Sequence, residues 1–311
     1  MASRVEATIT ADTATAGSRM WREAEHLLHQ LEHRWSRFLD HSDISQLNRA
    51  EGRPVVVDPS TITLVRTMVE AWGLTGGRFD PSVLPVLLDA GYRTSVDDPR
   101  RVTTLPTSAS FTGDSAIGEI RIDVHASTIE LPRHVALDPG GIGKGLAADL
   151  AVGHLLSLGA AGALVSIGGD LAAQGDPPDE GGWIVAIEDP LAAPNIVCTL
   201  LVDGGGVATS STRSRRWVRH GEECHHAIDP RHRAQSLTDL AAVTVIARSG
   251  WLAEAHATAA LLAGSADVLD YLELNDLSGV ATTWFGGVLA TSDLADDLSS
   301  TQPVLCPGGF G

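Results

Sequence analysis

Positive charge and cysteine are both scarce in this 311-residue chain, and each scarcity argues against a class of protein. The 22 lysine and arginine residues face 39 aspartate and glutamate residues, which gives a net charge of −17. A chain this acidic repels nucleic acid and anionic membranes, so we expect neither as a partner. The three cysteines, Cys198, Cys224 and Cys306, are odd in number and show no Cys-x-x-Cys spacing. The sequence therefore predicts neither a disulfide framework nor a zinc site.

Long apolar segments are also missing. No uninterrupted apolar run reaches roughly 18 residues, the length that indicates a transmembrane helix. The N-terminus lacks the basic and then apolar pattern of a signal peptide, so we expect a cytoplasmic protein. Apolar residues still make up 43% of the chain, enough to build a core in one large domain or two smaller ones.

The chain has a single lysine, Lys144, and the other 21 of its 22 lysine and arginine residues are arginines. This lysine lies in the stretch 137–149, which contains four glycines and leads from an apolar run into a helix-like pattern. Backbone amides at such a turn, together with a compact ammonium group, favour an anion and predict a phosphate or nucleotide site. A tight strand-to-helix turn with an incidental lysine explains the glycines equally well.

Apolar periodicity predicts a mixed α+β fold. Strands and helices alternate without a regular βαβ rhythm or an internal repeat. The predicted strands are 3–10, 163–167, 183–187, 196–202 and 241–247, with a hairpin near 279–291. The predicted helices are 18–38, 59–74, 144–158 and 250–263, with short helical segments at 44–48 and near 265–275. An acidic tail that ends in proline and glycine follows over 293–311.

The predicted helix 250–263 carries the first candidate for metal chemistry. Glu254 and Thr258 lie four residues apart, so a carboxylate and a hydroxyl group share one face. Oxygen ligands of this kind suit Mg²⁺, which accepts one or two carboxylates together with substrate phosphate oxygens. The alternative is a solvated glutamate and a threonine bonded to its own helix backbone.

Two turn-rich segments provide acid–base and ring-binding candidates. His226 and Asp229 occupy one of them, and histidine is the commonest acid–base residue near neutral pH, although a surface histidine fits as well. In the other, Phe79 is followed by Asp80, so an aromatic ring and a carboxylate would meet the plane and the polar edge of a ligand. A helix N-cap is an equal alternative for Asp80.

Other polar residues leave two readings open. Thr209, Ser210 and Ser211 either donate to phosphate or end a strand. Asn48 either caps a turn or contacts a ligand. An arginine-rich segment faces an anionic partner or protects a strand edge, and its residues are Arg213, Arg215, Arg216 and Arg219.

Taken together, these segments resemble the ApbE family of FAD:protein FMN transferases. The matching motifs, in order, are Phe38 with Ser42-Asp43-Ile44-Ser45-Gln46-Leu47-Asn48, Gly77-Arg78-Phe79-Asp80-Pro81-Ser82-Val83, Leu137-Asp138-Pro139-Gly140-Gly141-Ile142-Gly143-Lys144-Gly145, Val165-Ser166-Ile167-Gly168-Gly169-Asp170, Val207-Ala208-Thr209-Ser210, His226-Ala227-Ile228-Asp229-Pro230 and Ala253-Glu254-Ala255-His256-Ala257-Thr258. They span the chain from about residue 1 to about residue 265. No single motif is specific, but the ordered set is.

The resemblance implies a domain over 1–292 made of two intertwined lobes around an FAD cleft, followed by the 293–311 tail. It also implies transfer of FMN from FAD onto a Thr or Ser hydroxyl group of an acceptor flavoprotein with a flavinylation motif, with release of AMP. By position, Mg²⁺ would be bound by the Ala147 carbonyl, Glu254 and Thr258, and His226 would be the residue associated with activity. FAD contacts would fall on Met1, Ala2, Ser3, Phe38, Arg78, Phe79, Asp80 and Lys144. An FAD pyrophosphatase and a non-catalytic FAD-binding protein are the alternatives.

Three positions depart from the family pattern. Glu254 stands where the family has a metal-binding aspartate, and the extra methylene affects the position of its carboxylate. Arg233 replaces a turn glycine in the sequence Pro230-Arg231-His232-Arg233, and Ser211 replaces the glycine of a Thr-Ser-Gly motif.

Overall fold

The computed structural model describes residues 3–111, 116–179, 181–295 and 304–306. The chain divides into two compact units, each assembled from segments that are distant in the sequence. The first unit comprises 29–143 and 214–236, and the second comprises 3–28, 144–213 and the chain from 237 onward. Helix α1 (Ala14–Trp35) contributes to both units. Among the described residues, no helix has both the length and the apolar character needed to cross a membrane.

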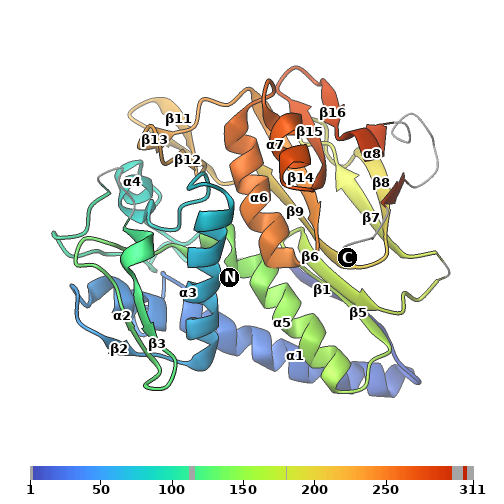
Figure 1. Cartoon of the computed structure of the whole chain (residues 1–311), viewed down its shortest axis with the longest axis horizontal. Helices are drawn as coiled ribbons and strands as arrows, with labels where there is room; N and C mark the ends of the chain where they lie inside the picture. Colours follow the sequence, from blue (N-terminus) through green and yellow to red (C-terminus); the bar gives the residue numbers. More distant parts are fainter. Residues whose placement is uncertain (1–2, 112–115, 180, 296–303, 307–311) are drawn as a thin grey trace. The chain divides into compact units, whose positions relative to one another are not determined.

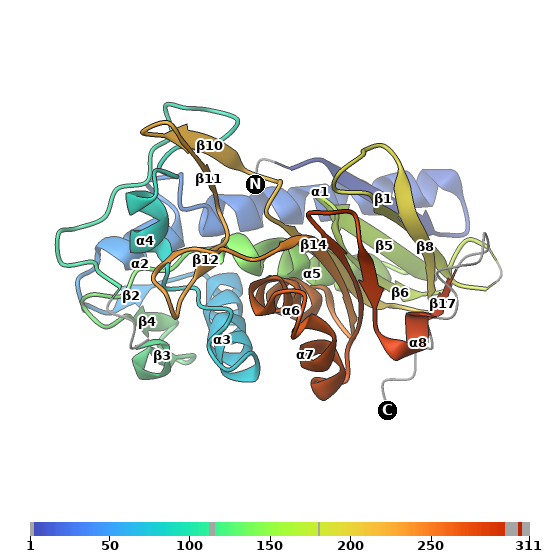
Figure 2. The ribbon, with the colours of Figure 1, turned by 90° about the horizontal axis from the view of Figure 1, so that it is seen from above.

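A seven-stranded antiparallel sheet forms the centre of the second unit (Figure 1). Its order is β1-β5-β6-β9-β14-β15-β16. The strands are β1 (Val5–Thr10), β5 (Gly162–Ile167), β6 (Asp170–Gly175), β9 (Gly205–Ser211), β14 (Leu240–Ala247), β15 (Ser278–Thr283) and β16 (Val288–Ala290). The helices of this unit are α5 (Gly143–Ser157), α6 (Gly250–Ala263) and α7 (Val268–Leu274). In Figures 1 and 2, α6 and α7 run beside β14 and β15.

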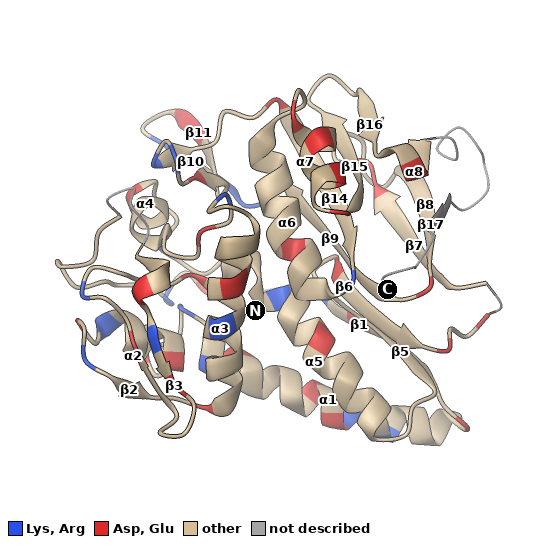
Figure 3. Ribbon diagram, viewed as in Figure 1, with Lys and Arg blue, Asp and Glu red and all other residues tan. Residues whose placement is uncertain are grey.

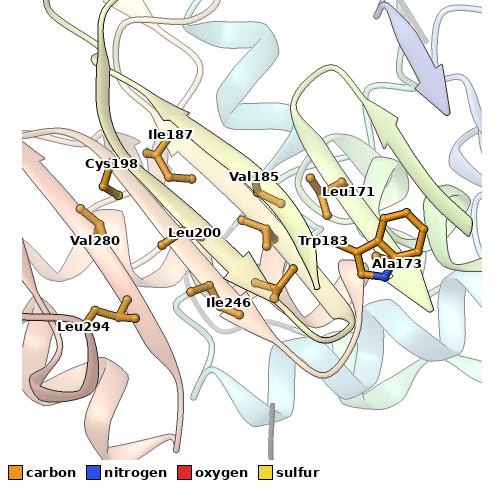
Figure 4. Packing of buried hydrophobic residues seen from close by; sticks show 12 residues of the cluster. Leu171, Ala173, Trp183, Val185, Ile187, Cys198, Leu200, Ile246, Val280 and Leu294 are labelled. Atoms are coloured by element: carbon orange, nitrogen blue, oxygen red, sulfur yellow. The ribbon is translucent and has the colours of Figure 1, made fainter. Parts of the chain in front are cut away.

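A three-stranded sheet packs against the central strands of the same unit. Its order is β17-β8-β7, and its elements are β7 (Trp183–Glu188), β8 (Ile196–Val202) and β17 (Val304–Cys306), with α8 (Ser292–Ala295) beside them. Alternate residues of β7 and β8 face a buried cluster that includes Leu171, Ile246 and Val280 from the central sheet (Figure 4). Alternation of buried and exposed residues along β7 is what a sheet with one covered face requires.

The first unit contains short elements joined by long turns. Its helices are α2 (Asp43–Arg49), α3 (Pro59–Leu74) and α4 (Leu84–Asp89), with 3-10 turns at η1 (Ile117–Glu119) and η2 (Pro139–Gly141). Its strands are β2 (Val55–Val56), β3 (Arg121–Asp123), β4 (Thr128–Glu130), β10 (Arg216–Arg219), β11 (Glu222–His225), β12 (Ile228–Asp229) and β13 (Ala234–Gln235). They pair as one three-stranded sheet, β2-β4-β3, and two hairpins, β10-β11 and β12-β13.

Local signals account for the ends of α3. The side chain of Asp58 accepts the backbone N–H of Ser60, and Pro59 occupies the first turn, where its missing N–H costs no helical bond. The helix ends before Gly76 and Gly77, whose φ angles of 58° and 76° lie in the left-handed region.

The predicted mixed α+β architecture is confirmed. The ranges predicted at 59–74, 196–202 and 250–263 coincide with α3, β8 and α6. Other boundaries differ: the helix expected at 18–38 is Ala14–Trp35, and β6, which the sequence did not predict, begins at Asp170 after a tight turn at Gly168 and Gly169, with φ of 63° and 95°. Of the tail expected over 293–311, Val304–Cys306 pair in parallel with β8, while 296–303 and 307–311 lie outside the described residues.

Candidate functional site

The single lysine of the chain contacts two buried carboxylates in the second unit. Lys144, at the start of α5, forms an ion pair with Asp170 at the start of β6, and its Nζ lies 2.9 Å from Oε1 of Glu254 in α6. The side chains of Asp170 and Glu254 are only 2% and 4% exposed. Burying two carboxylates is costly unless a positive charge and hydrogen bonds compensate them. Lys144 is therefore fixed in place by the two carboxylates, and its role as a nucleotide contact stays a prediction.

Glycines bring α5 and α6 close enough to build this cluster. A Cβ atom on Gly145, in α5, would lie 2.2 Å from the carbonyl oxygen of Gly250 in α6. On the β9 side, a Cβ atom on Gly206 would lie 2.3 Å from the Gly250 nitrogen. No side chain fits at either position. The close approach lets the Gly145 backbone N–H donate to Oε2 of Glu254 at 2.8 Å. The glycine turn thus positions the carboxylate as well as the lysine.

Hydroxyl groups extend the cluster along β9 and α6. The Thr209 backbone N–H donates to Asp170 Oδ1 at 3.0 Å, and the hydroxyl groups of Ser210 and Thr258 are 3.1 Å apart. Thr258 also donates to the Glu254 carbonyl at 3.2 Å, so the two residues share one face of α6. Thr209 and Ser210 lie within β9, and the reading in which they merely end a strand applies only to Ser211.

Asp149 was not identified from the sequence. Its two carboxylate oxygens accept the backbone N–H groups of Gly250 and Trp251 at 2.8 and 3.0 Å, which joins α5 to the first turn of α6. Burial raises the pKa of Asp149 to about 6, with a smaller contribution from the negative charge of Glu254, although the two backbone bonds act in the opposite direction. No spacing in the sequence connects Asp149 with a residue about a hundred positions away.

The remaining residues predicted in this unit differ in their surroundings. A Cβ on Gly168 would lie 2.9 Å from Ser3 Oγ and 3.7 Å from Lys144 Cδ, so Ser3 and Lys144 lie beside the same turn. Ala147 is completely buried in α5. Met1 and Ala2 lie outside the described residues.

The donor set around Glu254 fits a hard divalent cation. Glu254 Oε1 is buried, and its partner is the Lys144 ammonium group at 2.9 Å. Asp170 and Glu254 bring two negative charges against the single positive charge of Lys144, which leaves a net negative site. No cluster of three or more His, Cys, Asp or Glu side chains with metal-binding geometry occurs in the described part of the chain. The protein would therefore supply few ligands, as is usual where phosphate oxygens complete a Mg²⁺ shell. In the ribbon of Figure 3, α5 and α6 are mostly tan, the colour of residues other than Lys, Arg, Asp and Glu.

In the first unit, Phe38 belongs to an aromatic cluster organised by a buried arginine. The guanidinium carbon of Arg37 lies 4.1 Å from the Phe38 ring centroid and 4.9 Å from that of Tyr92. Arg37 also pairs with Asp138 at 3.3 Å and donates to Thr103 Oγ1 at 2.7 Å. The half-buried Phe38 ring is thereby held against a fixed cation. Neither Arg37 nor Tyr92 was identified from the sequence, because nothing in local spacing marks them.

The segment 78–80 is ordered by its own hydrogen bonds. Asp80 is buried, and its Oδ1 accepts the backbone N–H and the hydroxyl group of Ser82 at 2.8 and 2.6 Å. It stabilises a turn, whereas the N-cap residue of α4 is Val83. Phe79 is 3% exposed, and its N–H donates to Thr75 Oγ1 at 3.1 Å. The partly buried Arg78 precedes them. Their roles as FAD contacts stay predictions.

His226 follows β11 and is half-buried. Its Nδ1 lies 3.1 Å from the carbonyl oxygen of Ser214, which can only accept, so Nδ1 carries the proton. In the neutral ring this leaves the lone pair on Nε2, as a general base requires. The neighbouring His225 differs, because its Nδ1 accepts the Ala227 N–H at 3.3 Å. Burial lowers the pKa of His225.

Asp229 does not contact His226 through any hydrogen bond seen in the described residues. Instead it binds Arg231 and His232, at 3.2 and 2.8 Å. Burial alone would raise the pKa of Asp229, but these hydrogen bonds outweigh it and the pKa falls. Asp229 therefore stabilises the turn between β12 and β13.

Asn48 and the arginine-rich segment, for which the sequence left two alternatives open, make contacts within the protein. Asn48 donates to the Leu137 carbonyl at 2.9 Å and accepts the Leu137 N–H at 2.7 Å, so it holds the start of the glycine-rich stretch. The arginines of 213–219 are engaged within the protein: Arg215 donates to the Tyr92 hydroxyl at 3.0 Å, Arg216 pairs with Glu223, and Arg219 donates to the Asp89 carbonyl.

Comparison with known proteins identifies the family. A model of the ApbE family matches residues 1–282. This chain belongs to the ApbE family. It is 26% identical over 260 residues to the FAD:protein FMN transferase of Vibrio cholerae, covering 82% of this chain and 76% of that protein. It is 31% identical over 254 residues to the FAD:protein FMN transferase of Treponema pallidum, covering 76% and 69%. The crystal structure of the ApbE protein from Thermotoga maritima superimposes with a TM-score of 0.79 at 22% identity over 93% of each chain, a likeness of fold.

The structure gives a physical meaning to two departures of this ApbE family member from the family pattern. Arg233, in place of a turn glycine, has a φ of 54°, so the turn keeps the left-handed conformation that glycine adopts without strain. Glu254, in place of aspartate, accepts the Gly145 N–H at 2.8 Å. Ser211 instead donates to the Ala241 carbonyl at 2.8 Å.

Proposed function

We propose that this protein transfers FMN from FAD to a Thr or Ser hydroxyl group of an acceptor flavoprotein, with release of AMP, in the presence of Mg²⁺. The observation that carries the proposal is the buried cluster of Lys144, Asp170 and Glu254 at the glycine-rich turn of an ApbE family chain. Two curated relatives are named FAD:protein FMN transferase. A nucleotide pyrophosphate needs positive charge at its binding site, and this acidic chain provides one lysine and a site suited to a cation.

Glu254, Thr258 and the Ala147 carbonyl would hold the metal ion, and Lys144 would contact the nucleotide. Mg²⁺ supplies charge neutralisation at phosphate oxygens when it is bound. The buried Glu254 carboxylate, which shares its site with Asp170 and the single lysine, is the metal ligand with the clearest support. The hydrogen bonds from Gly145 N–H to Glu254 and from Gly250 N–H to Asp149 hold α5 against α6, and this contact fixes the position of the Glu254 carboxylate.

His226 would act as the general base. The oxygen of the acceptor hydroxyl group attacks the FMN phosphorus, the bond from that phosphorus to the bridging oxygen breaks, and AMP leaves with the bridging oxygen. The hydroxyl proton passes to His226 Nε2, which the Nδ1–H bond to Ser214 leaves as the basic nitrogen. Phe38, Arg78, Phe79, Asp80 and the N-terminal residues Met1, Ala2 and Ser3 are the proposed FAD contacts.

A single assay tests the proposal. The protein is incubated with FAD, MgCl₂ and an acceptor carrying a flavinylation motif, and the acceptor mass and the free nucleotides are followed. We expect an acceptor heavier by one FMN together with one equivalent of AMP. Free FMN and AMP without an adduct would indicate a pyrophosphatase instead, and bound but unchanged FAD would indicate a flavin-binding protein; either outcome refutes transfer.

Matched variants assign the metal ligand. Glu254→Gln keeps the size of the side chain and removes its charge. We expect the Mg²⁺ concentration that gives half-maximal activity to rise by at least about tenfold, because one charged ligand is lost. Glu25→Gln, on the exposed side of α1, is the control and should leave the Mg²⁺ titration unchanged. Equal titrations for both variants would remove Glu254 from the metal site.

A further inference from the structure

The tautomer of His226 depends on the orientation of one peptide group. The carbonyl that accepts the His226 Nδ1–H belongs to Ser214, and the next residue, Arg215, has a φ of 50°. For an arginine, this left-handed conformation costs roughly 1 kcal/mol or more, so it needs a compensating contact. Arg215 has one, because its guanidinium group donates to the Tyr92 hydroxyl at 3.0 Å.

Tyr92 is itself held in place from several sides. Its ring stacks on Trp217 with a centroid distance of 5.4 Å and an interplanar angle of 14°, and Arg37 lies 4.9 Å from its centroid. The Trp217 indole donates to the Ala90 carbonyl at 2.8 Å. Gly91, with a φ of 109°, permits this approach, because a Cβ there would lie 3.0 Å from the indole nitrogen. The phenol oxygen that receives Arg215 therefore has a fixed position within the first unit.

We propose that Tyr92 and Arg215 are positioning residues for His226. The Tyr92 hydroxyl holds the Arg215 side chain, the left-handed Arg215 backbone turns the Ser214 carbonyl toward His226, and that carbonyl keeps the imidazole proton on Nδ1. Free neutral imidazole side chains favour the proton on Nε2, so the carbonyl is needed to keep Nε2 basic. The inference deepens the proposed function, since it rests on His226 as the base for the acceptor hydroxyl group.

The tautomer can be measured without turnover. In protein labelled with ¹⁵N at histidine, long-range ¹H–¹⁵N spectra distinguish an Nδ1–H from an Nε2–H ring, and His226→Gln assigns the resonance. We expect the Nδ1–H form in the unaltered protein and a shift toward Nε2–H in Tyr92→Phe. This variant keeps the ring that stacks on Trp217 and removes only the oxygen that Arg215 reaches.

Kinetics with FAD and the acceptor supply the second readout. We expect Tyr92→Phe and Arg215→Ala to lower kcat by about 10- to 100-fold, as losses of orienting groups do, with the KM for FAD unchanged. Arg215→Gly should retain more activity than Arg215→Ala, because glycine adopts the left-handed φ without needing the contact with Tyr92. A double variant that carries Tyr92→Phe and Arg215→Ala should lose no more kcat than either single variant, because both changes remove the same hydrogen bond.

Arg219→Gln is the matched control. Arg219 belongs to the same hairpin and donates to the Asp89 carbonyl, but it has no bond with Tyr92 or Ser214 among those seen in the described residues. In Arg219→Gln, we expect the His226 tautomer and kcat to match those of the unaltered protein. An unchanged Nδ1–H tautomer in Tyr92→Phe, or equal slowing in Tyr92→Phe, Arg215→Ala and Arg219→Gln, overturns the positioning role. A shifted tautomer with undiminished transfer supports the positioning role and refutes His226 as the base, and absence of transfer in the unaltered protein refutes only the proposed function.

Discussion

The contact between α5 and α6 gives the sharpest test of how the cluster is built. We expect Gly145→Ala to destabilise the protein, because its Cβ would lie 2.2 Å from the Gly250 oxygen, 2.4 Å from the Gly250 carbonyl carbon and 2.7 Å from the Trp251 nitrogen. All three atoms belong to backbone, so no side chain can move aside. Ordinary contacts begin near 3.4 Å, and the two helix ends must separate by about 1 Å to accommodate the methyl group.

The magnitude follows from two losses. Overpacking in a closely packed interior costs about 1–3 kcal/mol. A separation of about 1 Å would also break the 2.8 Å bond from the Gly145 N–H to Glu254, and a hydrogen bond to a charged group contributes about 1.5–3 kcal/mol. Because partial relaxation offsets some of both, we expect the free energy of unfolding to fall by about 2–4 kcal/mol.

Urea denaturation followed by tryptophan fluorescence and circular dichroism measures the change. Gly153→Ala is the control in the same helix, since a Cβ there meets nothing within 4 Å. The free energy of unfolding of that variant should rise by about 0.5–1 kcal/mol, because alanine has a higher helix propensity than glycine. If Gly145→Ala unfolds at the same urea concentration as the unaltered protein or as Gly153→Ala, the two helices do not meet through Gly145. Gly145→Ala should also weaken Mg²⁺-dependent FAD binding, since it displaces Glu254.

Three further predictions concern other parts of the chain. Arg233→Gly should raise the free energy of unfolding by about 0.5–1 kcal/mol by relieving the left-handed φ of 54°, and a lower urea midpoint would mean that the arginine side chain contributes more than the strain costs. In FAD titrations, Lys144→Ala should weaken binding more than Arg233→Ala does, and equal effects would exclude Lys144 from the nucleotide site. Burial raises the pKa of Cys198 to about 11, so about 0.1% of it is thiolate at pH 8. In a chain with Cys224→Ser and Cys306→Ser, Ellman's reagent should therefore react on the order of 100-fold more slowly before urea unfolding than after it, and similar rates would contradict its burial.

Several elements and one pairing could be predicted from neighbouring residues alone. Glu254 and Thr258 share a face of α6 because the helical repeat of 3.6 residues puts positions four apart side by side. The range of α3 follows from a cap, a proline and two glycines within the segment itself. Such features depend on local conformational energy, which a short stretch of sequence determines.

The partners of the candidate residues could not be predicted in this way. Lys144 contacts Asp170, 26 residues away, and Gly145 binds Glu254, 109 residues away. These pairings depend on which strands adjoin and on the register between them, and many long-range registers are compatible with the same local pattern. For the same reason Asp149, Arg37 and Tyr92 had no sequence signal, and Asp80 proved to stabilise a turn instead of capping α4.

The sequence by itself determined the acidic character of the chain, its mixed helices and strands, and an ordered set of motifs that is specific to one family. Only the tertiary structure decided that the single lysine compensates two buried carboxylates, and that the histidine is oriented by a peptide group next to a left-handed arginine. Composition and periodicity are properties of the chain and its immediate neighbours. Burial and charge pairing arise when distant segments pack together, because removal of water makes each buried polar group depend on one specific partner.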